Sequence, residues 1–125
     1  MAIKIAIIDD DHHILEMYKY KFDKDGFEVR IANTAEDGFK LVKSFLPDLL
    51  LIDLLLPHEK GEDLLKRIRL EDWGKDLKVI VLTNTNREEA PGALDALDIS
   101  RYVIKAEQTV SQLEQIAKEV LGIED

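Results

Sequence analysis

Short apolar runs alternate along the chain with longer stretches in which apolar residues recur every three or four positions. The apolar runs, rich in β-branched residues and leucine, are typical of buried strands. They cover Ile3–Ile8, Glu28–Ala32, Leu49–Asp53, Lys78–Thr83 and Tyr102–Ile104. The intervening stretches have the spacing of amphipathic helices, as Ile14, Tyr18 and Phe22 illustrate. This rhythm predicts an α/β fold built from five strand–helix units.

The strands differ in how many faces they bury, and this predicts their order. Ile5–Ile8, Leu49–Ile52 and Val79–Leu82 are apolar throughout, so we expect them inside the sheet. Glu28–Ile31 alternates apolar and charged residues, and the last strand is short and flanked by charge, as edge strands are. A parallel, doubly wound sheet of order 2-1-3-4-5, with helices on both faces, satisfies both observations.

Helix ends are marked by residues with capping preferences. Asn33 precedes Glu36 by three positions and Thr109 precedes Gln112 by three, which is capping-box spacing. Gly26 is expected to end the first helix, because glycine accepts the backbone conformation that closes a helix.

Composition limits the classes of protein that the chain can belong to. Its 125 residues predict one domain over residues 1–125, and 46% hydrophobic with 34% charged residues is a globular balance. The net charge of −9 argues against nucleic-acid and anionic-membrane partners and favours cations or basic surfaces. Without cysteine, disulfides and Cys-ligated zinc are excluded. No run approaches a membrane span or a signal peptide, so we expect a cytoplasmic protein.

Polar side chains gather where the predicted strands end. Asp9 and Asp10 follow the first strand and Asp53 the third, while Thr83 and Lys105 end the fourth and fifth. In doubly wound sheets, ligands bind at this edge. Two carboxylates about 5 Å apart repel by roughly 3 kcal/mol at an effective dielectric near 20, so a counter-charge is required. Mg²⁺ accepts such oxygen ligands, and Lys105 offers a second positive charge.

Helix capping is the plainest alternative explanation for an aspartate after a strand. We expect Asp11 to be such a cap, because it directly precedes the first helix. One helix needs only one cap, so capping leaves Asp9 and Asp10 unexplained. Asp53 is followed by leucines and Pro57 rather than by a helix, so capping explains it poorly.

Five stretches resemble, in order and spacing, the receiver domain of bacterial two-component response regulators. They are Ile5–Asp11, Pro47–Asp53, Pro57–Gly61, Val79–Thr83 and Tyr102–Lys105. The match covers nearly the whole chain and includes a glycine eight residues after Asp53. The resemblance implies a flavodoxin-like (βα)5 three-layer sandwich and a protein that acts as a signalling switch.

The resemblance also implies the roles of the acidic residues. Asp53 would accept the phosphoryl group from a kinase phosphohistidine. Asp10 and Asp53 would ligate Mg²⁺ directly, Asp9 would act through water, and the backbone carbonyl of Leu55 would complete the metal site. A carboxylate nucleophile that forms an aspartyl phosphate is an established strategy.

Further implied roles concern the phosphoryl oxygens and the partners. Thr83 would hydrogen-bond one phosphoryl oxygen and Lys105 would pair with another, while Tyr102 would turn inward as the switch aromatic when Thr83 moves. The donor would be a sensor histidine kinase or a histidine phosphotransfer protein. The chain would catalyse only its own phosphorylation and slow dephosphorylation, so we do not expect an enzyme. A downstream protein, a fused output domain or a phosphorylation-dependent homodimer would read the signal.

Several positions depart from the family pattern. Asn84 stands where a small residue is usual, which would narrow access to the site, and Ala106 stands where proline is usual, which leaves the aim of Lys105 open. Pro91 predicts that the helix before the last strand starts late and is short. Leu55 cannot orient an attacking water, so we predict a slowly hydrolysed phosphoryl group.

Three other classes of function compete with this one. A receiver that does not switch and serves as a constitutive interaction module stays open, favoured by Asn84, Ala106 and Pro91. A haloacid-dehalogenase-type phosphatase needs an aspartate where this chain has Leu55. A nucleotide-binding protein would carry a phosphate loop rich in glycine after the first strand, where three aspartates stand instead.

Overall fold

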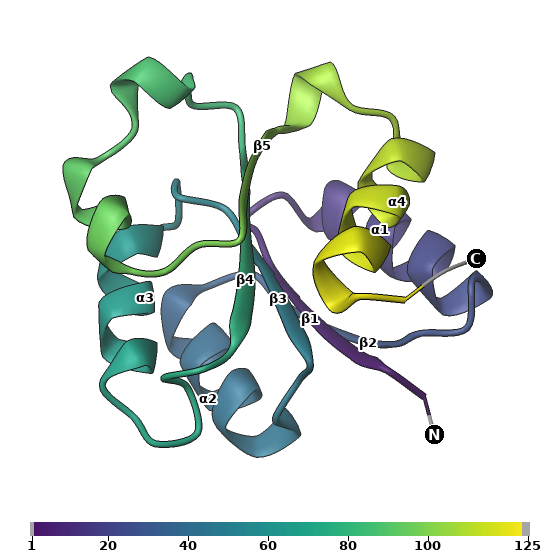
Figure 1. Cartoon of the computed structure of the whole chain (residues 1–125), viewed down its shortest axis with the longest axis horizontal. Coiled ribbons are helices and arrows are strands. Elements are labelled where there is room, and N and C mark those ends of the chain that lie inside the picture. Colours follow the sequence, from purple (N-terminus) through teal and green to yellow (C-terminus); the bar gives the residue numbers. More distant parts are fainter. Residues whose placement is uncertain (1, 124–125) are drawn as a thin grey trace.

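A five-stranded parallel sheet forms the centre of the molecule in the computed structural model, which describes residues 2–123 (Figure 1). The strands are β1 (Lys4–Ile8), β2 (Glu28–Ala32), β3 (Leu49–Ile52), β4 (Lys78–Thr83) and β5 (Arg101–Ile104). Their order is β2-β1-β3-β4-β5, and every neighbouring pair is parallel. The predicted order is confirmed, and the strand bounds differ from the predicted ones by no more than one residue.

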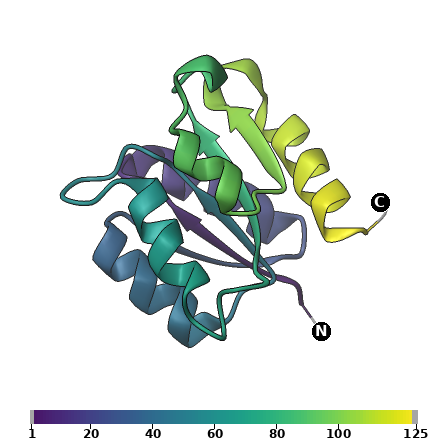
Figure 2. The same cartoon turned by 60° about the vertical axis from the view of Figure 1, so that its left-hand side comes forward.

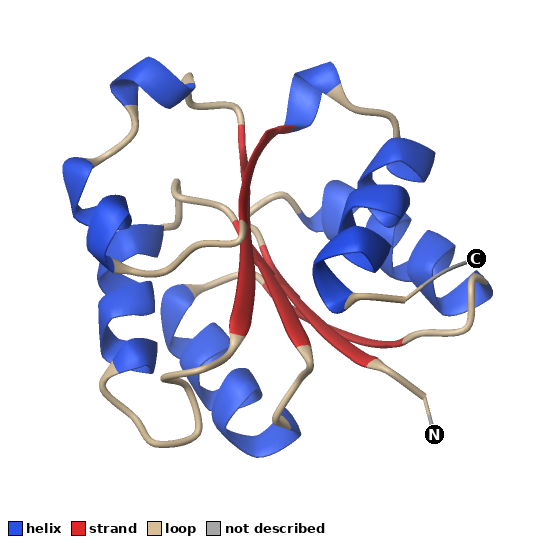
Figure 3. Ribbon diagram, viewed as in Figure 1, coloured by secondary structure: helices blue, strands red, loops and turns tan. Residues whose placement is uncertain are grey.

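Two helices cover each face of the sheet (Figures 1 and 3). They are α1 (His12–Lys24) and α4 (Val110–Leu121) on one face, and α2 (Ala35–Phe45) and α3 (Gly61–Arg69) on the other. Alternate residues of β1 enter opposite cores: Ala6 and Ile8 pack toward α2 and α3, whereas Ile5 and Ile7 pack toward α1 and α4. A strand buried on both faces must be apolar throughout, which is why the three interior strands read as continuous hydrophobic runs.

Three helix ends match their predicted signals and one does not. Asp11 caps α1 through its side chain, which accepts hydrogen bonds from two backbone N–H groups, and Thr109 forms the expected capping box with Gln112. Gly26 follows α1 with a φ of 97°, which suits glycine. The prediction of Asn33 as the cap of α2 was wrong. The N-cap is the next residue, Thr34, whose hydroxyl accepts from the N–H of Asp37 at 3.1 Å.

The segment between β4 and β5 contains no α-helix, which corrects the prediction of a short one starting near Pro91. Two short 3₁₀-helices, η1 (Arg87–Glu89) and η2 (Gly92–Ala96), stand in its place (Figure 2). Ala90 and Pro91 between them are extended, with ψ of 143° and 134°. A residue before proline avoids the helical region and proline cannot donate a backbone hydrogen bond, so no helix runs through this point. No helix among residues 2–123 is long and apolar enough to cross a membrane.

Candidate functional site

Three aspartates meet at the carboxyl edge of the sheet. Asp9 and Asp10 follow β1 and Asp53 follows β3; because Ile8 pairs with Ile52, the two strands end level with each other. One carboxylate oxygen from each aspartate lies within 4.8 Å of the others. Asp9 and Asp53 are 1% and 4% exposed, whereas Asp10 is exposed. The structure therefore assembles the predicted acidic cluster.

Backbone hydrogen bonds aim the two buried carboxylates. The N–H groups of Asp9 and Asp53 continue the sheet ladders, donating to the carbonyls of Ala32 and Ile8 at 3.1 and 3.0 Å. Oδ1 of Asp9 accepts from the N–H of Asp11 at 2.9 Å, and Oδ1 of Asp53 accepts from the N–H of Leu55 at 3.2 Å. One oxygen of each carboxylate is thus held by the backbone of its own turn, and the other oxygen, Oδ2, faces the Lys105 side chain.

The ammonium of Lys105, directly after β5, lies between the two buried carboxylates. Its Nζ is 2.8 Å from Oδ2 of Asp53 and also forms an ion pair with Oδ2 of Asp9, and the Lys105 side chain is only 10% exposed. Burial acts to lower the pKa of Lys105, but the combined interactions with the Asp53 and Asp9 carboxylates outweigh burial, so the pKa is raised. Burial also raises the pKa of Asp9, against the opposing effect of Lys105.

Thr83 and Tyr102, the two residues expected from the resemblance to act in switching, are connected through Thr85. Thr83 ends β4 and is fully buried, and its Oγ1 accepts from the N–H of Thr85 at 3.4 Å. The phenol of half-buried Tyr102 donates to the carbonyl of Thr85 at 2.7 Å. The Arg87 guanidinium lies 5.3 Å from the centre of the Tyr102 ring. Thr85 therefore connects the end of β4 to the Tyr102 side chain on β5.

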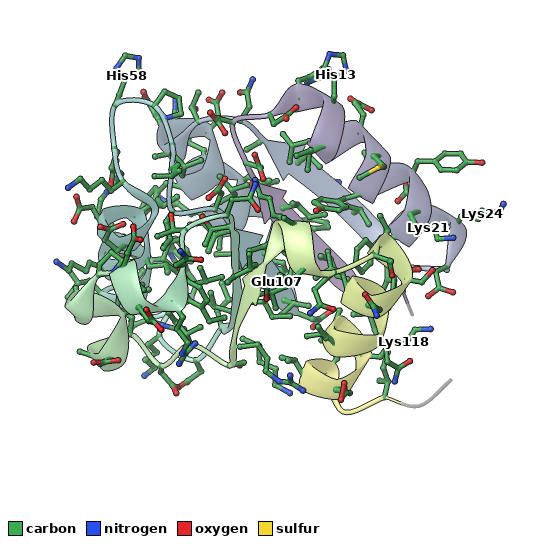
Figure 4. The ribbon with its side chains drawn as sticks, turned by 90° about the horizontal axis from the view of Figure 1, so that it is seen from above. His13, Lys21, Lys24, His58, Glu107 and Lys118 are labelled. Atoms are coloured by element: carbon green, nitrogen blue, oxygen red, sulfur yellow. The ribbon has the colours of Figure 1, made fainter. Side chains whose placement is uncertain are left out.

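The loop from Asp53 to Gly61 passes close beside the acidic cluster. The N–H of Gly61 donates to the carbonyl of Leu54 at 2.9 Å, which closes the loop onto its own base. The side chain of Leu55 is 62% exposed beside the cluster, and its carbonyl as a metal ligand stays a prediction. His58 of this loop and His13 of α1 point outward from the molecule (Figure 4), and the metal-ligand cluster found among residues 2–123 contains aspartates alone.

One contact of the site was missed by sequence reasoning. Oδ1 of Asn84, the residue after Thr83, accepts a hydrogen bond from the N–H of Ala106, the residue after Lys105, at 3.0 Å. The Lys105–Ala106 peptide bond is trans, which answers the question that the absence of proline left open. The signal in the sequence was that two departures from the family pattern occupy the positions after two site residues.

The donor set fits Mg²⁺. Three carboxylates within reach of one another supply hard oxygen ligands, and the cluster contains neither sulfur nor imidazole. The partly exposed position of the cluster at the sheet edge suits an ion that keeps several waters.

Comparisons with known proteins agree with this geometry. The family model of the response regulator receiver domain matches residues 5–118. The chain therefore belongs to the response regulator receiver domain family of two-component signalling, and its fold is CheY-like.

Individual relatives cover different shares of the chain. The phosphate regulon transcriptional regulatory protein PhoB of Rhizobium meliloti is 30% identical over 105 residues, which is 84% of this chain and 46% of PhoB. A CheY-like receiver domain protein from Methanospirillum hungatei has a TM-score of 0.89 at 28% identity, covering 98% of this chain and 95% of that one. The chain is also similar in fold to chemotaxis response regulator CheY4 of Vibrio cholerae, with 19% identity and a TM-score of 0.87. The alignment covers 96% of this chain and 99% of CheY4. The chain spans less than half of the length of the curated relatives that it matches.

Proposed function

We propose that this chain is a phosphoacceptor switch in which Asp53 receives a phosphoryl group from a phosphohistidine. The observation that carries the proposal is the position of Asp53. Its carboxylate is buried at the end of an interior strand, beside two further aspartates, with one oxygen held by the backbone and the other 2.8 Å from an ammonium group. Such an arrangement suits a carboxylate nucleophile, because an ammonium group is already in place to neutralise the negative charge that the incoming phosphoryl group brings.

The transfer requires positioning and charge neutralisation. An oxygen of Asp53 forms the new bond to phosphorus while the phosphorus–nitrogen bond of the donor breaks, and the imidazole leaves with that bond's electron pair and takes up a proton. Lys105 pairs with a phosphoryl oxygen, and the Thr83 hydroxyl donates a hydrogen bond to another. Neutralising the equatorial oxygens in this way is the main contribution that proteins make to phosphoryl transfer.

Asp9, Asp10 and Asp53, with the carbonyl of Leu55, would hold Mg²⁺. The bound ion would supply positive charge to the phosphoryl oxygens. The aspartates supply the ligands, and Asp9 also keeps Lys105 at the site through its ion pair. The ammonium that now bridges Asp9 and Asp53 would then be shared between these carboxylates and the phosphoryl group.

Phosphorylation would change the surface around β4 and β5. Movement of Thr83 toward the phosphoryl group would disturb its contact with Thr85, whose carbonyl is the acceptor for Tyr102. Tyr102 would then lose its present partner and turn inward. A downstream protein or a fused output domain would read the change, and a homodimer that uses this face would do so with η2 in place of a helix.

The donor proposed for the cell is a sensor histidine kinase or a histidine phosphotransfer protein, and the cytoplasm is the compartment where both are expected. Whether residues 1–125 act as one domain alone or within a longer protein changes the reader of the signal and leaves the chemistry at Asp53 unaltered.

Phosphoramidate, a small phosphodonor with a phosphorus–nitrogen bond, tests the proposal directly. With Mg²⁺ present, intact-mass spectrometry should show one added phosphoryl group on the wild type and none on Asp53→Asn, and chelation of Mg²⁺ should prevent the addition. A wild type that stays unmodified, or a variant that is modified equally, would refute the phosphoacceptor role.

The second candidate, a receiver that does not switch, is favoured by the missing helix between β4 and β5. Amide NMR shifts distinguish the two. A switch should show shifts at Thr83, Thr85 and Tyr102 upon phosphorylation, whereas a passive interaction module should show changes only around Asp53.

A further inference from the structure

Two loops at the site are joined by one side-chain hydrogen bond, from the N–H of Ala106 to Oδ1 of Asn84 at 3.0 Å. We propose that Asn84 is a positioning residue for Lys105, fixing the backbone turn from which the ammonium reaches Asp9 and Asp53. The kinetic part of this inference rests on the proposed function, and the structural part stands without it.

The bond begins where the sheet ladder ends. Thr83 and Ile104 are the last paired residues of β4 and β5, and the two segments that follow them are no longer paired through the sheet. Asn84 and Ala106 lie one and two residues past that pair. The Asn84 side chain therefore links the two segments where backbone pairing has ceased, and it joins the residue after Thr83 to the residue after Lys105.

The bond also satisfies a helix start that has no cap of its own. Ala106 is the second residue of η3 (Lys105–Glu107), a three-residue 3₁₀-helix. The first N–H groups of a helix have no partner within it, and the residue before it usually supplies a side-chain acceptor. Here that residue is Ile104, which makes no side-chain cap. Asn84, 22 residues earlier in the chain, provides the acceptor instead.

The turn that Asn84 fixes carries Lys105, whose ammonium group contacts two carboxylates at once. Lys105 is the first residue of η3, and its Nζ must lie within hydrogen-bond distance of Asp9 and Asp53 together. Because the side chain must reach two buried partners, the position of its Nζ depends on the position of the Lys105 Cα. Release of the Ala106 N–H would let the turn shift, and the ammonium would lose its fixed place between the carboxylates.

The two residues are matched in chemistry. The Ala106 N–H is a donor, so the amide oxygen of Asn84 must face it, and the amide nitrogen lies on the other side. A proline after Lys105 would remove the donor, and a small aliphatic residue after Thr83 would remove the acceptor. The two departures from the family pattern are thus the two halves of one hydrogen bond.

Four variants test the inference: Asn84→Leu, Asn84→Asp, Ala106→Pro and the double variant Asn84→Leu/Ala106→Pro. Leucine keeps the size of asparagine but has no acceptor, and aspartate keeps the acceptor. With phosphoramidate and saturating Mg²⁺, Asn84→Leu should be phosphorylated about three- to tenfold more slowly than the wild type, the worth of one hydrogen bond. Asn84→Asp should stay within about twofold, and adding Asn84→Leu to Ala106→Pro should cause no further loss.

Two structural readouts need no phosphodonor. Asn84→Leu should speed hydrogen exchange of the Ala106 amide and shift the NMR resonance of the Lys105 ammonium, and Asn84→Asp should restore both. Two results would overturn the positioning role. One is an Asn84→Leu variant that is phosphorylated at the wild-type rate. The other is a double variant in which Asn84→Leu slows phosphorylation as much in the Ala106→Pro background as it does in the wild type. A wild type that takes no phosphoryl group would refute the proposed function, and the exchange and ammonium signals would still decide for or against Asn84.

Discussion

Lys105 and Asp53 are 52 residues apart in the chain, yet Nζ of the one lies 2.8 Å from Oδ2 of the other. Together with the ion pair to Asp9, this contact places one ammonium against two buried carboxylates. Removing one member of a buried charge cluster leaves the rest uncompensated, which costs more than removing an exposed pair. Lys105 therefore serves both the fold and the proposed chemistry.

Lys105→Met should separate these two contributions. Phosphorylation by phosphoramidate should slow by about 100-fold, since one stabilising charge at the phosphoryl oxygens is lost. In Mg²⁺-free buffer the free energy of unfolding should fall by about 3 kcal/mol. Because the ammonium no longer competes for the carboxylates, Mg²⁺ should raise the melting temperature of the variant more than that of the wild type. A smaller Mg²⁺ effect in the variant would contradict this account.

Gly61→Ala should damage the loop that follows Asp53. A Cβ on Gly61 would lie 2.7 Å from Cα of Leu54 and would clash with the carbonyl of Asp53, so the backbone that carries the nucleophile must shift. We expect a loss of about 2 kcal/mol in urea unfolding, together with slower phosphorylation. Gly92→Ala is the matched control, because nothing lies within 4 Å of its Cβ position. Equal losses in both variants would argue against the contact as the cause.

The strand order and the acidic cluster could be predicted because both follow from local patterns. A strand buried on both faces is apolar throughout, and this placed β1, β3 and β4 inside the sheet. Once β1 and β3 were neighbours, the aspartates after them had to meet at one edge. Asn33 and Thr34 show the limit of such patterns. Both can cap a helix and both precede an acidic residue by three, so spacing did not decide between them.

Contacts between segments far apart in the sequence could not be predicted from these local patterns. The guanidinium of Arg69 in α3 donates to the carbonyls of Leu97 and Asp98, which follow η2 and lie 28 and 29 residues away in the chain. The link between Asn84 and Ala106 depends on two loop conformations at once. Neither partner has a periodic signal, so only the folded arrangement reveals the pairs.

Leu55 should slow the loss of the phosphoryl group from Asp53. Its side chain is apolar and 62% exposed two residues after the nucleophile, so it offers no group to orient an attacking water. The phosphorylated wild type should persist for minutes or longer after the donor is removed, and Leu55→Gln should decay about tenfold faster. The equally apolar but distant Leu70, 85% exposed, provides the control Leu70→Gln, which should leave the decay unchanged. Loss from the wild type within seconds would contradict the prediction.

Arg69 should be important for stability through the segment between β4 and β5. Its guanidinium donates to the carbonyls of Leu97 and Asp98 and to three carbonyls of the loop before β4. Arg69→Met should lower the free energy of unfolding by about 2 kcal/mol, since these acceptors lose a charged donor. Arg101→Met, which breaks an exposed 3.4 Å ion pair with Glu119, should cost less than about 1 kcal/mol. Hydrogen exchange should quicken around η2 in the first variant and stay unchanged there in the second.

Glu114 should make the stability of the fold depend on pH through its contact with Asp25. Burial raises the pKa of Glu114 above its ordinary value of 4.5, and the nearby Asp25 adds to the effect, while Lys21 and Lys118 act against it. The hydrogen bond from Lys118 lowers the pKa of Asp25, and Nζ of Lys118 lies 3.0 Å from its Oδ2. Glu114 on α4 therefore keeps its proton to a higher pH than an isolated glutamic acid does, and Asp25 at the end of α1 ionises at a lower pH than an isolated aspartic acid does.

The sign of the effect follows from proton linkage. With its pKa raised in the fold, Glu114 contributes stability below pH 4.5 that is lost as the pH rises through the folded pKa. Asp25, with a lowered pKa, contributes stability above pH 3.8 that is lost only as the pH falls through its folded pKa. Glu114→Gln removes the pH-dependent contribution of Glu114 to the free energy of unfolding. It should therefore unfold at higher urea than the wild type at about pH 7.5, and the difference should shrink toward about pH 4. A difference between the two proteins that stays constant over this range would show that the Glu114 carboxylate does not carry the effect.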